Sequence, residues 1–286
     1  MVMCWLPKLT IFSKSNFLYL IFNLIRMITE KYILVLGASG NLGGKVAEEL
    51  LGRGERVGVV ARDAKHLSRF SDKAILLVGD YMNDDFLREA LANASALFCT
   101  IPAEALATPE TSAQRLMALL KESPVTHVVN ISNCTLKRDG MYTSLIAFEK
   151  ELSKIEGIAV KHLRCANFFE NLNWGIDTPY LPDLKLPYIS SYEIAYVATN
   201  YLQQRNFEGI TVDELLGERD YSMAELASLV GVSYTQLPYS EENISFYRPF
   251  NEGDYELVPR TAQNTTHPIE EKFTLDYFIR HELRLV

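Results

Sequence analysis

A glycine-rich turn between two apolar stretches constrains the fold of this chain more than any other feature. Residues 32–36 form an uninterrupted apolar run that is too short for a helix and typical of a buried strand. Gly37, Gly40 and Gly43 follow at the spacing GxxGxxG, and apolar residues then recur at the helical period. Residues 56–61 form a second short apolar strand. The order of strand, glycine turn, helix and strand predicts a βαβ unit with a phosphate-binding site at the start of its helix.

Two of these glycines have a clear physical reason in such a unit. Gly37 lets the chain turn sharply off the strand, and Gly43 lets the helix pack closely on the sheet. The backbone amides of Asn41 and Leu42 would then point at a bound pyrophosphate, together with the positive end of the helix dipole. An ordinary strand-to-helix loop is the alternative. Because a strand precedes the glycines and a helix follows them, the pattern favours a dinucleotide-binding site.

The composition is that of a protein with a full hydrophobic core. Of the 286 residues, 48% are hydrophobic and 22% are charged, which permits one large α/β domain or a domain with a smaller lobe. A net charge of −8 without a basic cluster argues against a nucleic-acid-binding surface. The cysteines show no CxxC spacing, so we expect buried free thiols in a reducing compartment, the cytoplasm, and assign no metal ligands. They are Cys4, Cys99, Cys134 and Cys165.

Residues 1–27 differ in kind from the rest of the chain. They carry three basic residues and no acidic one, and their densest apolar run, residues 17–25, is too short to span a bilayer. No small-residue cleavage site follows this run, as a signal peptide would require. A membrane-surface helix and an organellar presequence stay open as alternatives. We favour the interpretation that translation starts at Met27, directly before the first strand.

Strand and helix patterns alternate as far as Cys165. Asp84 or Asp85 is expected to cap the helix after the third strand. The alternation predicts a parallel, doubly wound α/β sheet with helices on both faces. The further strands are expected at residues 74–78, 96–101, 127–131 and 159–164, and the helices between them at about 86–91, 110–120 and 144–154.

Beyond Cys165 the pattern changes. Residues 165–190 are rich in aromatic residues, asparagine and proline without a clear period, which is typical of a loop or lid near a ligand. A hydrophobic patch that packs a small C-terminal lobe is the alternative. Farther on, we expect a helix at 192–202, a strand at 209–216 and a helix at 223–229 with Ser222 as its cap. The last part of the chain indicates only that helices are present.

Several segments together resemble NmrA-like proteins, which are atypical members of the short-chain dehydrogenase/reductase superfamily. VLGASGNLGGKVAEELL is similar to their opening and LRCANFFENL to the exit of their sixth strand. ISSYEIA resembles the motif before their late helix, and ELLGERDYSMAELASLVG resembles their C-terminal-lobe motif. The resemblance implies a doubly wound Rossmann fold with a smaller C-terminal α/β lobe. We therefore divide the chain into an extension (1–27), an NAD(P)-binding domain (28–165) and a smaller lobe interleaved with it (166–286).

The resemblance also implies a cofactor site, residue by residue. Residues 39–44 would line the pyrophosphate, Asp80 and Tyr81 would flank the adenine, residues 100–102 would lie on the ribose side, and residues 168–171 would lie at the nicotinamide end. The implied cofactor-binding residues are Gly37, Ser39, Gly40, Asn41, Leu42, Gly43, Gly44, Arg62, Asp80, Tyr81, Thr100, Ile101, Pro102, Phe168, Phe169, Glu170 and Asn171.

Arg62 points to the identity of the dinucleotide. It stands at the end of the second strand, where an NAD enzyme has a carboxylate on the ribose 2′-hydroxyl. A guanidinium at this position suits the 2′-phosphate of NADP instead. Asp63 follows one position later, which leaves NAD as the less favoured alternative.

The catalytic residues of the larger superfamily are only partly present. Its typical members use a Ser, a Tyr, and a Lys four residues after the Tyr, and the Lys lowers the pKa of the Tyr. Ser132 matches the Ser position and Tyr142 the Tyr position, but Ile146 stands where the Lys should be. Lys150 lies two helical turns from Tyr142 and is at best a substitute. Ser132 and Tyr142 are therefore the candidate catalytic residues, without a matching lysine.

Two functions follow from the resemblance. The first is an NADPH-dependent reductase of a small carbonyl compound or quinone, because hydride transfer needs mainly a cofactor held against an acceptor. The second is a non-catalytic redox sensor that binds NADP(H) and changes the state of a protein partner. We thus expect a small-molecule substrate or a protein partner, no nucleic acid and no integral membrane span.

Overall fold

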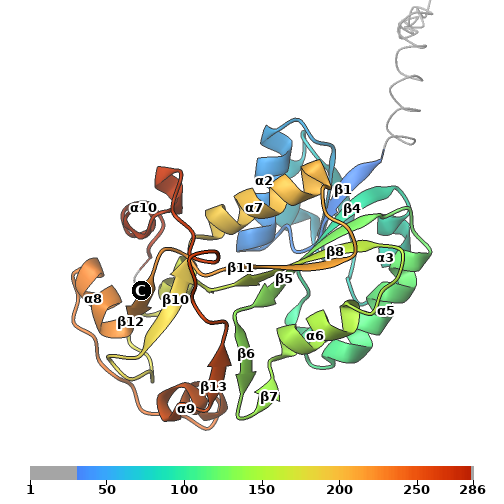
Figure 1. Cartoon of the computed structure of the whole chain (residues 1–286). Coiled ribbons are helices and arrows are strands. Elements are labelled where there is room, and N and C mark those ends of the chain that lie inside the picture. Colours follow the sequence, from blue (N-terminus) through green and yellow to red (C-terminus); the bar gives the residue numbers. More distant parts are fainter. Residues whose placement is uncertain (1–30, 285–286) are drawn as a thin grey trace, which may run out of the picture. The chain divides into compact units, whose positions relative to one another are not determined.

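The computed structural model describes residues 31–284, and these are built around one parallel β-sheet (Figure 1). Its strands are β1 (Tyr32–Val35), β2 (Val57–Ala61), β3 (Ile75–Val78), β4 (Ala94–Cys99), β5 (His127–Asn133), β8 (Ala159–Cys165) and β11 (Ile210–Leu215). Their order is β11-β8-β5-β4-β1-β2-β3, and every neighbouring pair is parallel. The strand order runs outward from β1 in both directions, which is a doubly wound topology. The predicted fold class is therefore confirmed.

Helices cover both faces of this sheet, as the alternation of strands and helices requires. Helices α2 (Asn41–Gly52) and α7 (Ser191–Gln204) lie together on one face (Figure 1). Helices α3 (Asp84–Leu91), α5 (Pro109–Lys121) and α6 (Ser144–Leu152) contribute to the core on the other face. A short helix, α4 (Ala103–Leu106), follows β4.

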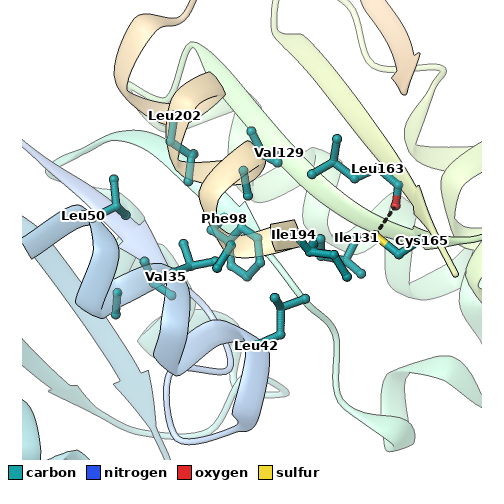
Figure 2. Packing of buried hydrophobic residues seen from close by; sticks show 14 of the residues in the cluster. Val35, Leu42, Leu50, Phe98, Val129, Ile131, Leu163, Cys165, Ile194 and Leu202 are labelled. Carbon is teal, nitrogen blue, oxygen red and sulfur yellow. Dashed lines mark hydrogen bonds between the residues drawn. The ribbon is translucent and has the colours of Figure 1, made fainter. Parts of the chain in front are cut away.

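The core between the sheet and α2/α7 consists mostly of aliphatic side chains, with Phe98 at its centre and Phe70 and Phe207 as further buried aromatic residues. Phe98 of β4 is fully buried among Val35 of β1, Leu50 of α2, and Ile194 and Leu202 of α7 (Figure 2). Alternate residues of each central strand point to the two faces, so a strand buried on both sides reads as the continuous apolar run seen in the sequence. Complete burial of such a side chain stabilises the fold by about 1.5–3 kcal/mol.

A smaller lobe with its own core lies beyond β8. Its elements are β9 (Asn167–Phe168), the 3-10 helix η2 (Phe169–Trp174), β10 (Lys185–Ile189), β12 (Asp220–Ser222), α8 (Met223–Val230), α9 (Ile244–Glu252), β13 (Tyr255–Leu257), the 3-10 helix η3 (Glu271–Phe273) and α10 (Leu275–His281). Strands β12, β10 and β9 form a second sheet, and aromatic residues such as Phe169 and Tyr221 are buried there. Because α7 and β11 return to the large sheet, the lobe is interleaved with it; the boundary at residue 165 stays a prediction.

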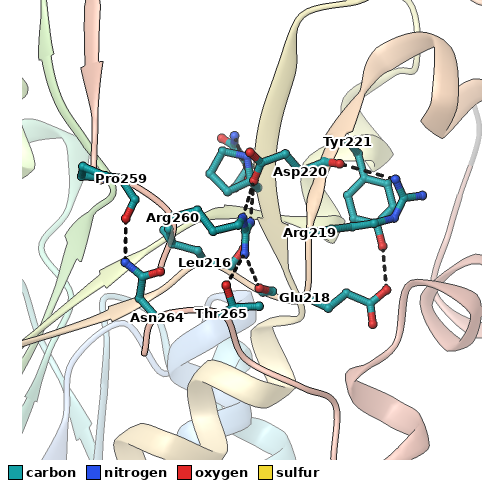
Figure 3. Close-up of polar contacts among 12 residues, drawn as sticks. Leu216, Glu218, Arg219, Asp220, Tyr221, Pro259, Arg260, Asn264 and Thr265 are labelled. Atoms are coloured by element: carbon teal, nitrogen blue, oxygen red, sulfur yellow. Dashed lines mark hydrogen bonds and ion pairs between the residues drawn. The ribbon is translucent and has the colours of Figure 1, made fainter. Parts of the chain in front are cut away.

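Arg260 joins the lobe to the end of β11. Its guanidinium donates to the carbonyl oxygens of Leu216 and Gly217, at 2.9 and 2.7 Å, and pairs with Asp220 (Figure 3). Nearby, the Asn264 amide donates to the carbonyl of Pro259 at 2.9 Å. These bonds hold the loop that follows β11 against the segment that follows β13.

The local predictions were mostly, but not wholly, correct. Ser222 caps α8 as predicted, in a capping box with Glu225. The predicted cap of α3 is wrong, because the side chain of Asn83, and not that of Asp84 or Asp85, accepts hydrogen bonds from the first helical amides. The hairpin of β6 (Thr135–Arg138) and β7 (Met141–Tyr142), to which β13 adds a third strand, was not predicted; neither was the 3-10 helix η1 (Ala64–Phe70) as a defined element.

The extension predicted at residues 1–27, with its alternative start at Met27, lies outside the described residues, as does Cys4. Cys99, Cys134 and Cys165 are buried and free, as expected, and burial raises the pKa of each thiol. Over residues 31–284, no helix is long and apolar enough to cross a membrane.

Candidate functional site

The turn between β1 and α2 is shaped by two glycines. Gly37 has a φ of +67°, a left-handed conformation that favours glycine, and an added Cβ would overlap the hydroxyl oxygen of Thr100. That hydroxyl donates to the Leu36 carbonyl at 3.0 Å and so ties the ends of β1 and β4 together. At Gly43 a Cβ would overlap the carbonyl oxygen of Gly37. The helix therefore starts directly against the turn, with no side chain between them.

The start of α2 leaves backbone amides available for an anion. Gly40 is the N-cap, and among the described residues no side chain caps the helix and no acidic residue stands in its first turn. The first amides of a helix have no intrahelical acceptor, and they carry the positive end of its dipole. These amides border a cavity lined by Gly40, Asn41, Leu42 and Gly43. The residues present therefore fit a pyrophosphate.

A first cavity, with a volume of about 220 Å³, lies at the ends of β1, β2, β3 and β4. The predicted residues that line it are Gly37, Ser39, Arg62, Asp80, Tyr81, Thr100, Ile101 and Pro102. Sequence reasoning missed Glu104, which also lines it and whose carboxylate lies 3.3 Å from the Arg62 guanidinium. Arg62 is 72% exposed, so its side chain is free to reorient towards a ligand.

Two acidic positions near this cavity are already engaged in turns. One carboxylate oxygen of Asp80 accepts the Met82 amide at 2.9 Å. Asp63 caps η1 by accepting the Lys65 amide at 2.9 Å, pairs with the Lys65 ammonium at 2.8 Å, and does not line either cavity described here. Hydrogen bonds from Lys65 lower the pKa of Asp63, so the carboxylate stays ionised and bound to its own turn.

Tyr81 forms an aromatic wall of the first cavity. Its ring lies 5.1 Å from the Arg115 guanidinium carbon, and the same guanidinium donates to the Tyr81 carbonyl at 2.6 Å. The Tyr81 hydroxyl is buried without a hydrogen-bond partner in the described part of the chain. Burial raises the pKa of this phenol, so it is neutral near pH 7 and presents a flat, apolar face.

A second, more open cavity of about 1010 Å³ lies between the start of α2, the 3-10 helix η2 and the end of α10. Its predicted lining residues are Gly37, Ser39, Gly40, Asn41, Leu42, Gly43, Thr100, Phe168, Glu170 and Asn171. Two predicted residues line neither cavity. Gly44 faces the guanidinium of Arg69, and Phe169 is 4% exposed in the lobe core against Tyr221 and Phe278.

Sequence reasoning missed several residues of the second cavity, of which Lys45 is the most connected. They are Lys45, Asn173, Trp174, His281, Glu282 and Arg284. The Lys45 ammonium bonds Glu170 at 2.6 Å, Ser191 at 2.8 Å and Glu282 at 3.1 Å, and lies 3.7 Å from the centre of the Tyr192 ring. Lys45 follows Asn41 by one helical turn and so lies on the same face of α2. This spacing was the only feature of the local sequence that could have placed Lys45 at the cavity.

The structure separates the two candidate catalytic residues from these cavities. Ser132 is buried, and its hydroxyl donates to Glu149, which also pairs with Arg164 at 2.6 Å. Tyr142 is on β7, half exposed, with the Lys150 ammonium 4.6 Å from its ring centre. Neither lines the first or the second cavity; Tyr142, Lys150 and Arg164 border a different cavity. The catalytic assignment of Ser132 and Tyr142 thus stays a prediction.

The hairpin explains this separation. Tyr142 stands two positions before the start of α6, but the unpredicted strands β6 and β7 intervene between β5 and α6, and Tyr142 pairs with Lys137 across the hairpin. Helix α6 then begins at Ser144, and Ile146, at the position of the missing lysine, is buried.

Comparison with known sequences identifies the nucleotide-binding part. The sequence model of a family described as NAD(P)H-binding matches residues 37–171, which include the glycine turn and both groups of cavity residues up to Asn171. No curated protein sequence matches the chain.

Solved structures show the same fold at low sequence identity. A triphenylmethane reductase from Citrobacter sp. is 18% identical over 87% of this chain and 99% of that one, with a TM-score of 0.68. An NADPH-dependent quinone oxidoreductase from Escherichia coli, solved with NADPH, is 21% identical over 74% and 80% of the two chains, with a TM-score of 0.63. The negative transcriptional regulator NmrA, solved with NADP, is 14% identical over 78% and 81%, with a TM-score of 0.63; it has also been solved with NAD.

These similarities agree with the resemblance drawn from the sequence motifs. The glycine turn and most residues of the first cavity lie within the matched range, residues 37–171. Residues 37–171 thus match the NAD(P)H-binding family, and the chain has the same Rossmann-type fold as NmrA.

Proposed function

We propose that the protein is an NADPH-dependent reductase of a small carbonyl compound or quinone. One observation carries this proposal: the two cavities share Gly37, Ser39 and Thr100. Gly37 follows β1 and Thr100 follows β4, the two strands between which the strand order reverses. Open α/β sheets bind their ligands at this crevice, so a dinucleotide would extend from the first cavity into the second.

The second cavity leaves room for an acceptor beside the nicotinamide end. Phe168 and Asn171 line it on the side of the small lobe, and Trp174 stands at its rim. The quinone oxidoreductase and the dye reductase with the same fold support a reducing function. Reduction of a quinone by hydride needs no strongly tuned protein acid.

NADP is the cofactor that the charges favour. Arg62 lines the first cavity, and within residues 31–284 the one carboxylate that pairs with its guanidinium is the exposed Glu104. Asp63, the residue that could bind the ribose hydroxyls of NAD, is engaged by Lys65 instead. A guanidinium and a phosphate dianion form charge-assisted hydrogen bonds, which a ribose hydroxyl cannot match.

When bound, the dinucleotide supplies the hydride. A quinone takes up this hydride and one proton from solvent, so that a hydroquinone and NADP⁺ result. The chain then has three tasks: the α2 amides hold the pyrophosphate, Arg62 holds the 2′-phosphate, and the second cavity holds the acceptor against the nicotinamide.

A non-catalytic sensor that binds NADP(H) and changes the state of a protein partner is the second candidate. Two observations favour it. Neither Ser132 nor Tyr142 lines the first or the second cavity, so these two cavities lack the pair of hydroxyl groups that typical reductases use. The fold is also that of the regulator NmrA.

Consumption of NADPH with a panel of quinones and aldehydes separates the two candidates. Gly43→Val is the control, because a side chain there would overlap the Gly37 carbonyl and so displace the turn proposed to hold the cofactor. Reduction of an acceptor by the unchanged protein but not by this variant supports the reductase. NADPH binding without consumption of any acceptor would overturn it in favour of the sensor.

A further inference from the structure

We propose that the acceptor is a planar aromatic anion, such as a naphthoquinone sulfonate, held between the indole of Trp174 and the guanidinium of Arg284. This inference rests on the proposed reductase function and narrows its substrate class. It comes from three features of the second cavity: an exposed indole on a fixed turn, a neutralised lysine, and an arginine whose side chain has no partner among residues 31–284.

Trp174 is unusually exposed for so large an apolar side chain. Its side chain is 88% exposed, more than any other large hydrophobic side chain among residues 31–284, and it lines the second cavity. Single exposed apolar residues are common on surfaces, so exposure alone proves little. This one, however, borders a cavity that Phe168 also lines, where an indole offers a flat face for stacking.

The backbone under Trp174 is held in place although its side chain is not. Phe169 and Leu172 of the same 3-10 helix are buried in the lobe core, at 4% and 2% exposure. The Asn173 side chain accepts the Arg284 backbone amide at 2.7 Å. The indole is thus presented from a fixed turn, and Arg284 is fixed next to it.

The charges of the cavity select an anion at this place. The Lys45 ammonium already pairs with the carboxylates of Glu170 and Glu282, which neutralise its positive charge. The Arg284 side chain is exposed, lines the same cavity, and has no hydrogen bond or ion pair to any residue between 31 and 284. A ring that stacks on Trp174 could therefore pair an acidic substituent with this guanidinium.

Steady-state kinetics with two acceptors of the same ring system test the proposal: unsubstituted naphthoquinone and naphthoquinone sulfonate. Trp174→Ala should raise KM for both by about tenfold, as expected for a lost stacking face, and Trp174→Phe should restore most of the loss. Arg284→Gln should raise KM for the sulfonate about three- to tenfold more than for the neutral quinone. The matched control is Arg248→Gln, which replaces an exposed arginine on α9.

A binding measurement keeps this inference separate from the proposed function. Trp174 is one of two tryptophans, so in a Trp5→Phe background its fluorescence reports directly on its own site. Quenching by the sulfonate in the presence of NADP⁺ should weaken about three- to tenfold with Arg284→Gln. If quenching behaves so but no acceptor is reduced, the reductase proposal fails and the binding site stands.

Two results would overturn the inference. In the first, Trp174→Ala still reduces both quinones and has the same KM for each of them as the unchanged protein. This result would show that the indole does not hold the acceptor. An Arg284→Gln variant that loses NADPH affinity as strongly as sulfonate affinity would assign the guanidinium to the pyrophosphate of the cofactor.

Discussion

The ammonium of Lys45 and the carboxylate of Glu170 lie 2.6 Å apart, and this pair connects the helix of the glycine turn to the segment that follows β8. The side chains are only 10% and 14% exposed, and Glu282 shares the same ammonium. The pair therefore holds three parts of the second cavity together: the start of α2, the 3-10 helix η2 and the end of α10.

Replacing Lys45 should destabilise the protein more than replacing Glu170. Lys45→Met leaves two partly buried carboxylates without their cation, and loss of one partner of a fully buried ion pair costs about 3–5 kcal/mol, which is the upper bound here. Glu170→Gln keeps an acceptor for the ammonium and should cost about 1 kcal/mol. Urea unfolding measures both free energies, with the exposed Lys121→Met as control. Equal stability of Lys45→Met and the control would mean that the pair contributes nothing to the fold.

Arg62 should discriminate between the two dinucleotides. Charge-assisted bonds to a phosphate contribute about 1.5–3 kcal/mol, which is roughly 10- to 150-fold in affinity. Arg62→Ala should therefore weaken NADPH by this factor and leave NADH nearly unchanged, as measured by titration calorimetry. Arg88→Ala, an exposed arginine on α3, is the control. A similar loss for both dinucleotides would show that Arg62 contacts the adenine or supports the fold.

Ser132 and Tyr142 should matter little for catalysis. A positioned general acid typically contributes about 10²–10⁴ in rate, but neither residue lines the first or the second cavity. Tyr142→Phe and Ser132→Ala should each reduce kcat less than tenfold on the best acceptor. Ser132→Ala should also cost about 1–3 kcal/mol of stability, because its hydroxyl serves the buried Glu149. A thousandfold loss of kcat with intact cofactor affinity would restore both as catalytic residues.

The parts of the fold that depend on neighbouring residues could be predicted from the sequence. The apolar run from Tyr32 to Leu36 is buried on both sides, and the glycine spacing that follows it reflects contacts within the turn itself. In the same way, Ser222 and Glu225 lie three positions apart and form the predicted capping box. Such features need no knowledge of distant segments.

The candidate site was only partly predictable because its remaining residues meet through tertiary contacts. The partners of Lys45 stand 125, 146 and 237 positions away in the chain, and no periodicity relates them. Phe169 and Trp174 belong to one short 3-10 helix, yet one is buried and the other exposed. Tyr142 lies two positions before α6, close to the expected start of that helix, but on the short strand β7, which no sequence pattern indicated.

His162 should make the stability of the protein fall on mild acidification. It is fully buried on β8, with the Asn130 amide 3.0 Å from one ring nitrogen and the Ser153 hydroxyl 3.1 Å from the other. The contacting atom is the amide nitrogen Nδ2, which can only donate, so Nδ1 of the ring accepts this bond and the ring is neutral. Burial lowers the pKa of His162 to about 4, against about 6.5 in an unfolded chain.

Between these two pKa values the unfolded chain binds a proton that the folded protein does not, so the free energy of unfolding decreases as the pH falls from 6.5 towards 4. A difference of this size corresponds to about 3 kcal/mol over the whole interval. Urea unfolding of the full chain at a series of pH values measures it. His162→Gln removes the titrating ring and should flatten the dependence by that amount, whatever its effect at neutral pH, while His66→Gln, an exposed histidine on η1, should not. An unchanged slope in His162→Gln would show that the ring is protonated inside the folded protein.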